Sequence, residues 1–133
     1  MAMRASFAGC AIRLVEPDGF DDYQRSLRAG RRLSNPTTVG SVCDALMAEA
    51  PGPKGFAINR AHDAEAVTVS DQAVLAAVAF AARELKLVVE PGGAVGLAAL
   101  LEGRINCRGG TVVVVLSGAN IDDSLLAEVL TKN

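Results

Sequence analysis

The strongest constraint on the fold is a run of five apolar residues, Val112 to Leu116, without any alternation of apolar and polar side chains. A strand with one face in water alternates, so a continuous run predicts a strand that is buried on both faces. This is typical of an inner strand in a parallel sheet that helices cover on both sides. Ligands of open α/β sheets bind beyond the carboxyl ends of the strands, so Ser117 is where a ligand-binding side chain is expected. The alternative is a simple strand-to-helix turn in which Asn120 or Asp122 caps the last helix.

The rest of the chain predicts alternating strands and helices. Strands are expected at residues 11–16, 65–70 and 109–116, and helices at 21–30, 38–50, 55–61, 71–86, 92–102 and 122–130. Ser70 is the expected cap of the longest helix, and Gly30 is the expected end of the first. Helices between successive strands imply right-handed crossovers, and therefore a three-layer α-β-α fold around a small parallel sheet. Three strands are few for so many helices, so the pattern indicates part of a larger domain.

The composition favours one domain, residues 1–133, with an aliphatic core. Half of the residues are hydrophobic, but aromatic residues make up only 4% and tryptophan is absent. The net charge of −2 gives no electrostatic reason to expect binding to nucleic acid or to an anionic membrane. The one basic cluster, Arg25, Arg28, Arg31 and Arg32, is interpreted as a solvated helix end, with an anion contact as the less favoured alternative. The first fourteen residues are too weakly apolar to predict a signal peptide or a membrane span.

Cysteine and histidine usage excludes several kinds of site. Cys10, Cys43 and Cys107 are widely spaced and odd in number, which matches neither a disulfide framework nor a metal-ligand pattern. A reducing, cytoplasmic location is the resulting expectation. His62 is the only histidine, so neither a Ser-His-Asp triad nor a Cys-His pair can be assembled around another one.

Several short motifs, taken together, point to a family. Val-Glu-Pro occurs twice, at residues 15–17 and 89–91, and the other motifs are SVCDAL (41–46), FAINR (56–60), VTVSD (67–71) and VVVVLSGANID (112–122). In order and spacing they resemble the C-terminal part of the pyridoxal-phosphate-dependent serine/threonine dehydratases, which have the tryptophan-synthase-β fold type. Serine racemase and hydroxyaspartate dehydratase are near relatives of that family. The resemblance covers residues 11–125 and implies that the chain forms part of the family's large domain.

The resemblance implies a cofactor site. Ser117 matches the serine that hydrogen-bonds the pyridine nitrogen of pyridoxal phosphate, and Gly118 follows it in the same turn. Glu90 matches a glutamate near the cofactor ring, and Ala45 lies in a segment beside the ring. A hydroxyl holds the ring nitrogen less firmly protonated than a carboxylate does, so the cofactor is a milder electron sink. Mild withdrawal suffices for the loss of a β-hydroxyl group.

The resemblance also implies a cation site in the first Val-Glu-Pro segment. Its racemase-like members bind Mg²⁺ or Ca²⁺ at positions that correspond to Glu16, the carbonyl group of Phe20, and Asp22. Hard cations prefer oxygen ligands of this kind. In the alternative interpretation, Asp21 and Asp22 are acids in the first turn of a helix, where they stabilise its N-terminus.

Two parts of the family's machinery do not match this sequence. The Schiff-base lysine belongs to a Ser-x-Lys-x-Arg-Gly stretch, and Lys54, Lys86 and Lys132 lack that context. The glycine-rich phosphate loop has no counterpart either. The prediction is therefore that no residue of this chain is catalytic and that the chain alone does not deaminate threonine or serine.

Three interpretations follow. The chain is a dehydratase fragment completed by an N-terminal chain, a silent module that binds a cofactor, an amino acid or a cation, or a homo-oligomer that covers its exposed apolar surface. A completed site would take a small hydroxy amino acid, which the sequence leaves open among threonine, serine and 3-hydroxyaspartate.

Overall fold

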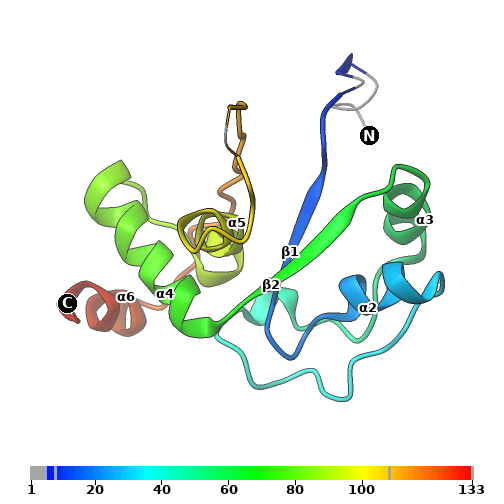
Figure 1. Ribbon diagram of the computed structural model, residues 1–133. Helices are drawn as coiled ribbons and strands as arrows, with labels where there is room; N and C mark the ends of the chain where they lie inside the picture. The colour runs from blue at the N-terminus through cyan, green and yellow to red at the C-terminus, as the bar shows by residue number, and fades with distance from the viewer. Residues whose placement is uncertain (1–5, 8, 108, 133) are drawn as a thin grey trace.

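A computed structural model describes residues 6–7, 9–107 and 109–132 of the chain (Figure 1). The elements in order are β1 (Arg13–Pro17), α2 (Asp22–Ala29), the 3-10 turn η1 (Asp44–Leu46), α3 (Pro53–Ala61), β2 (Glu65–Val69), α4 (Asp71–Phe80), the π-helical turn η2 (Ala81–Leu85), α5 (Pro91–Leu101) and α6 (Asp123–Thr131). None of the helices in the described part is long and apolar enough to cross a membrane.

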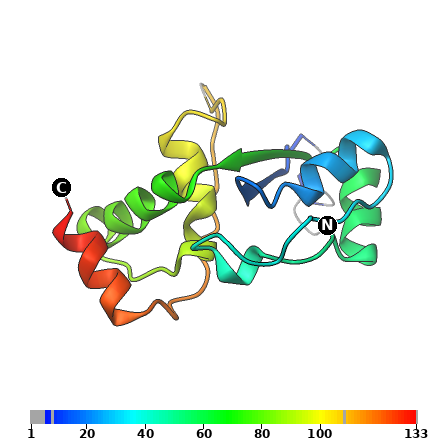
Figure 2. The same cartoon turned by 90° about the horizontal axis from the view of Figure 1, so that it is seen from below.

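The two strands pair in parallel, with Arg13 opposite Glu65 and Pro17 opposite Val69. Helix α5 contacts both strands, whereas α2 contacts β2 and α3 packs against α2. Both views place α2 and α3 on one side of the sheet and α4, α5 and α6 on the other (Figures 1 and 2). The predicted class, an α/β fold with helix layers around a small parallel sheet, is confirmed.

The core is aliphatic, as the composition predicts. It lies mainly between α4, α5 and the sheet, and Val69, Val74, Val78 and Cys43 are among its fully buried side chains. Alanines dominate the faces of α4 and α5 that meet, so the two helices pack closely. The Tyr23–Phe56 ring pair, with centroids 6.5 Å apart, lies outside this core, between α2 and α3.

The helix ends follow the sequence signals. The Ser70 hydroxyl accepts the Ala73 N–H at 3.2 Å and caps α4, and Gly30 ends α2 with a φ of 67°. The Asp122 carboxylate accepts the N–H groups of Ser124 and Leu125, so the alternative that assigned Asp122 to capping the last helix is confirmed. Hydrogen bonds from the Ser124 hydroxyl and from these two N–H groups lower the pKa of Asp122.

The predicted third strand at 109–116 is wrong for this structure. The segment 111–122 has no regular secondary structure and does not join the two-stranded sheet. Val114 and Leu116 pack against the core, but Val113 and Val115 are 73% and 75% exposed. The run therefore buries one of its faces and leaves the other without a neighbouring layer.

Two helix predictions also need correction. The segment 38–50 is largely irregular and contains only the short turn η1. Its polar groups bond locally instead, because the Asp71 carboxylate accepts the Ser41 hydroxyl at 2.6 Å and the Val42 N–H at 3.1 Å. The helix predicted at 71–86 exists, but its last turn is π-helical and ends at Lys86, which has a φ of 60°.

Candidate functional site

The N-terminus of α5 meets the turn that follows the valine run. The Glu90 N–H donates to the Gly118 carbonyl oxygen at 3.1 Å, and the Glu90 carboxylate accepts the Asn120 N–H at 3.1 Å. Pro91 begins the helix at a position where its missing N–H costs nothing. Glu90 therefore joins the start of α5 to both ends of the turn formed by residues 118–120.

Two glycines allow this close approach. A Cβ atom on Gly93 would lie 1.6 Å from the Ser117 carbonyl oxygen, so only glycine fits between α5 and this backbone. A Cβ atom on Gly118 would lie 2.2 Å from the Glu90 carboxyl carbon, and Gly118 also has a φ of 73°. Helix and turn consequently pack backbone to backbone.

The four residues predicted to bind a cofactor gather around the start of α5. Ser117 and Gly118 face Gly93 and Glu90, and the Ala45 methyl group lies 3.5 Å from where a Gly92 Cβ would be. Ser117 is exposed, and its hydroxyl makes no hydrogen bond to any residue that the structure describes. A neutral hydroxyl that can donate or accept suits the ring nitrogen of pyridoxal phosphate, so the donor chemistry present here fits that cofactor.

The residues predicted to bind a cation have other partners. The two oxygens of Glu16 accept the N–H groups of Tyr23 and Gln24 at 2.8 and 2.9 Å, which places the carboxylate on the N-terminus of α2. The Asp22 carboxylate accepts the Asn35 side-chain amide at 2.6 Å, and Phe20 is buried. Helix N–H donors compensate the Glu16 charge that a cation would need. Among the described residues, no group of three or more His, Cys, Asp or Glu side chains could hold a metal ion. These residues, as folded, do not fit a cation site.

Burial decides the protonation of Glu16. The residue is 8% exposed, and desolvation raises the pKa of its carboxyl group to about 7, although the two N–H donors act in the opposite direction. The nearby charges of Asp22 and Asp21 raise it further. The first Val-Glu-Pro glutamate is thus a buried brace between β1 and α2.

The sequence analysis missed Gly93 and Asn120. Both act through the backbone, one by lacking a side chain and the other by its N–H. The spacing of Gly93 and Gly96 was the available signal, because these residues lie one helical turn apart and both face the segment 114–117.

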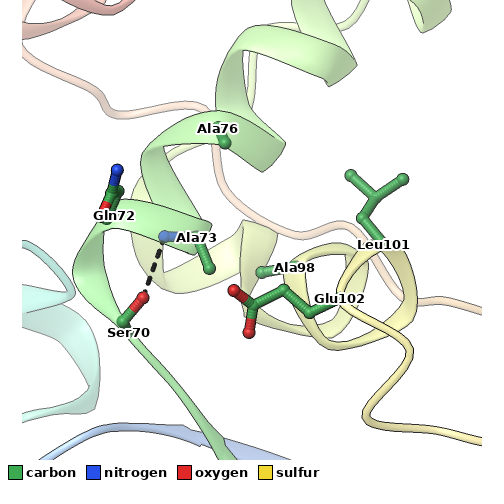
Figure 3. A pocket seen from close by; sticks show the side chains of 7 residues that line it. All are labelled: Ser70, Gln72, Ala73, Ala76, Ala98, Leu101 and Glu102. Carbon is green, nitrogen blue, oxygen red and sulfur yellow. Dashed lines mark hydrogen bonds between the residues drawn. The ribbon is translucent and has the colours of Figure 1, made fainter.

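Two hollows lie away from this site. One, of about 370 Å³, is lined by small and polar side chains at the start of α4 and the end of α5, shown in Figure 3: Ser70, Gln72, Ala73, Ala76, Ala98, Leu101 and Glu102. The other, of about 700 Å³, lies between α4, η2 and α6. Neither hollow is lined by a residue that was predicted to bind the cofactor.

Comparisons with known proteins agree on one family. Residues 1–118 match the sequence profile described as "Pyridoxal-phosphate dependent enzyme". The chain is 34% identical over 122 residues to an L-threo-3-hydroxyaspartate ammonia-lyase of Saccharomyces cerevisiae, covering 92% of this chain and 37% of that protein.

Solved structures give the same result. The threonine deaminase of the organism abbreviated T.th. superposes with a TM-score of 0.83 at 36% identity, covering 91% of this chain and 44% of that one. Maize serine racemase has the same TM-score at 29% identity, covering 96% of this chain and 40% of that one. The chain therefore spans about two fifths of the length of these relatives.

Proposed function

Because the chain belongs to the pyridoxal-phosphate-dependent enzymes, the family predicted from its motifs, we propose that it forms the ring-nitrogen side of a pyridoxal phosphate site. The observation that carries the proposal is the exposed Ser117 hydroxyl, held on a turn that is locked to α5. In this assignment Ser117 hydrogen-bonds the ring nitrogen, Gly118 and Glu90 support the turn, and Ala45 lies beside the ring.

The proposed reaction of the completed site is β-elimination from a small hydroxy amino acid, with release of ammonia. The names of the relatives support this class, because one acts on 3-hydroxyaspartate and others are a threonine deaminase and a serine racemase. Bound pyridoxal phosphate withdraws electrons from the substrate's α-carbon and so assists loss of the α-proton and of the β-hydroxyl group. Ser117 contributes by holding the ring nitrogen with a neutral hydroxyl group, which keeps that withdrawal mild.

We further propose that turnover needs polypeptide beyond this chain, supplied by a complementing N-terminal chain or by the remainder of a longer one. The reason is that the lysine and the phosphate loop of the family have no counterpart among the motifs of this sequence. The exposed valine segment 112–116 supports a partner, because its backbone forms no hydrogen bonds with the described residues and two of its side chains face solvent. A second copy of the chain is the alternative partner, and association at micromolar concentration by light scattering would favour it.

The test of the cofactor assignment is a calorimetric titration with pyridoxine phosphate, which lacks the aldehyde and so cannot react with the lysines. We expect saturable binding that Ser117→Ala weakens by about two- to tenfold, the usual effect of one neutral hydrogen bond. Ser34→Ala is the matched control, because Ser34 is an exposed serine in a loop before η1. Absence of saturable heat, or equal affinity for Ser117→Ala and the unchanged chain, would contradict the assignment.

A further inference from the structure

The side chain of Glu90 points away from its own helix. Glu90 occupies the cap position of α5, yet its carboxylate bonds none of the helix's first N–H groups. It bonds the Asn120 N–H instead, thirty residues further along the chain. A glutamate at a helix start that does not cap that helix must serve another purpose.

The contacts of Glu90 enclose the residue that bears the proposed ring-nitrogen hydroxyl. Its N–H holds the Gly118 carbonyl oxygen, and its carboxylate holds the Asn120 N–H, so residues 118–120 are gripped at both ends. On the other side, the Ser117 carbonyl oxygen rests against the bare Cα of Gly93. Ser117 therefore lies between two fixed points of its own backbone.

The same use of a glutamate occurs elsewhere in the molecule. In the first Val-Glu-Pro segment, the Glu16 carboxylate accepts two backbone N–H groups of α2. In the second, the Glu90 carboxylate accepts one backbone N–H of the turn. In both copies the glutamate oxygen atoms bind backbone amides of a distant segment.

We infer that Glu90 is a positioning residue, which fixes the Ser117 hydroxyl by holding the backbone of residues 118–120. This inference rests on the proposed function and deepens it, because the sequence resemblance assigned Glu90 to the cofactor itself. A positioning role depends on the reach of the side chain and on an acceptor oxygen. A direct electrostatic role at the cofactor would depend on the negative charge.

Three substitutions separate reach from charge. Glu90→Gln keeps the length and one acceptor oxygen, Glu90→Asp keeps the charge but is one methylene shorter, and Glu90→Ala removes both. The measurement is amide hydrogen exchange of Asn120 by NMR in the chain without any cofactor. The Ala73 amide, which the Ser70 hydroxyl holds in α4, serves as the internal control for folding.

We expect Asn120 exchange in Glu90→Gln to stay within about threefold of the unchanged chain, and in Glu90→Asp and Glu90→Ala to be about tenfold faster, as for loss of a hydrogen bond to a charged acceptor. The Ala73 amide should not change. Equal Asn120 exchange in all variants, or slow exchange in Glu90→Asp with fast exchange in Glu90→Gln, would overturn the inference. If Glu90→Ala unfolds, the comparison of Gln with Asp still decides.

The result does not depend on cofactor binding, so this inference and the proposed function can fail separately. Slow exchange retained in Glu90→Gln together with no binding of pyridoxine phosphate would keep the positioning role and reject the cofactor site. Binding of pyridoxine phosphate with unchanged exchange in Glu90→Ala would do the reverse.

Discussion

The carbonyl oxygen of Ser117 lies where the side chain of any other residue at position 93 would begin, 1.6 Å from an ideal Gly93 Cβ. Helix α5 and the turn after the valine segment are therefore in backbone contact, and the position of the Ser117 hydroxyl depends on a missing methyl group.

Gly93→Ala should destabilise the chain, because either α5 or the turn must move to admit the methyl group. The expected loss is about 1–3 kcal/mol, as for other overpacked sites. Gly92→Ala is the matched control, since its Cβ would make ordinary contacts at 3.5 Å with Ala45 and Leu46. Alanine favours the helical conformation, so the control should be neutral or up to about 1 kcal/mol more stable. Urea unfolding of both variants measures the difference, and equal midpoints would contradict the contact.

Gly118→Ala should cost more stability than Gly103→Ala. The two glycines have φ values of 73° and 68°, so each substitution introduces similar backbone strain of about 1 kcal/mol or more. A Cβ on Gly103 meets open space, whereas one on Gly118 meets the Glu90 carboxyl group at 2.2 Å. The excess loss at position 118, measured by thermal unfolding, reports the contact with Glu90. The same cost at both positions would mean that strain alone matters.

Stability should fall as the pH rises from about 4.5 to about 7, because of Glu16. The folded state raises the pKa of this carboxyl group from 4.5 to about 7, so in that range the folded chain holds a proton that the unfolded chain has released. Its stabilising contribution is complete below pH 4.5, amounts to about 3 kcal/mol, and is lost as the pH passes the folded pKa.

Glu16→Gln cannot titrate and should flatten this pH dependence. Glu65→Gln, with a side chain that is 67% exposed, is the control and should retain the slope. The measurement is urea unfolding at several pH values between about 4 and 8, which span the titration of Glu16. Stability that rises with pH in the unchanged chain would show that the N–H donors of α2 outweigh the burial of Glu16.

Cys43 should resist thiol reagents in the folded chain. Its side chain is fully buried, and burial raises the pKa of the thiol to about 11, so only about one thousandth of it is thiolate at pH 8. Cys107 is exposed and should react first. Labelling at about pH 8, where an ordinary thiol is partly ionised, followed by peptide mass analysis gives the order. Cys43 should be labelled at a comparable rate only in denaturant, and its early modification would indicate that the 41–46 segment opens readily.

The sequence predicted those features that depend on local signals. Ser70, Gly30 and Pro91 mark helix ends through their own hydrogen bonding or backbone preference, and the structure places them there. The valine run was placed wrongly because its composition records what it can pack against, whereas strand formation also needs a neighbouring strand. The segment 38–50 failed for a related reason, since Asp71 holds its backbone in a loop from about thirty residues away.

The site was predictable in part. Ser117, Gly118, Glu90 and Ala45 came from the family resemblance, and the structure brings them to one end of α5. Gly93 and Asn120 escaped notice because their contributions are backbone contacts, which leave no mark on side-chain chemistry. Glu16 was assigned to a cation because its sequence context does not reveal the two N–H groups that meet it in the fold.

The parallel pairing of β1 with β2 also bears on how the chain acquires its structure. Each paired residue of β1 lies more than fifty positions before its partner, with α2, η1 and α3 between them. Helices α4 and α5 are neighbours in the sequence and can associate through a short loop. Closing a long loop is slow relative to local pairing, so the sheet should form after the α4–α5 hairpin. During synthesis, β1 would leave the ribosome well before β2 exists, and it would spend that interval as an unpaired strand.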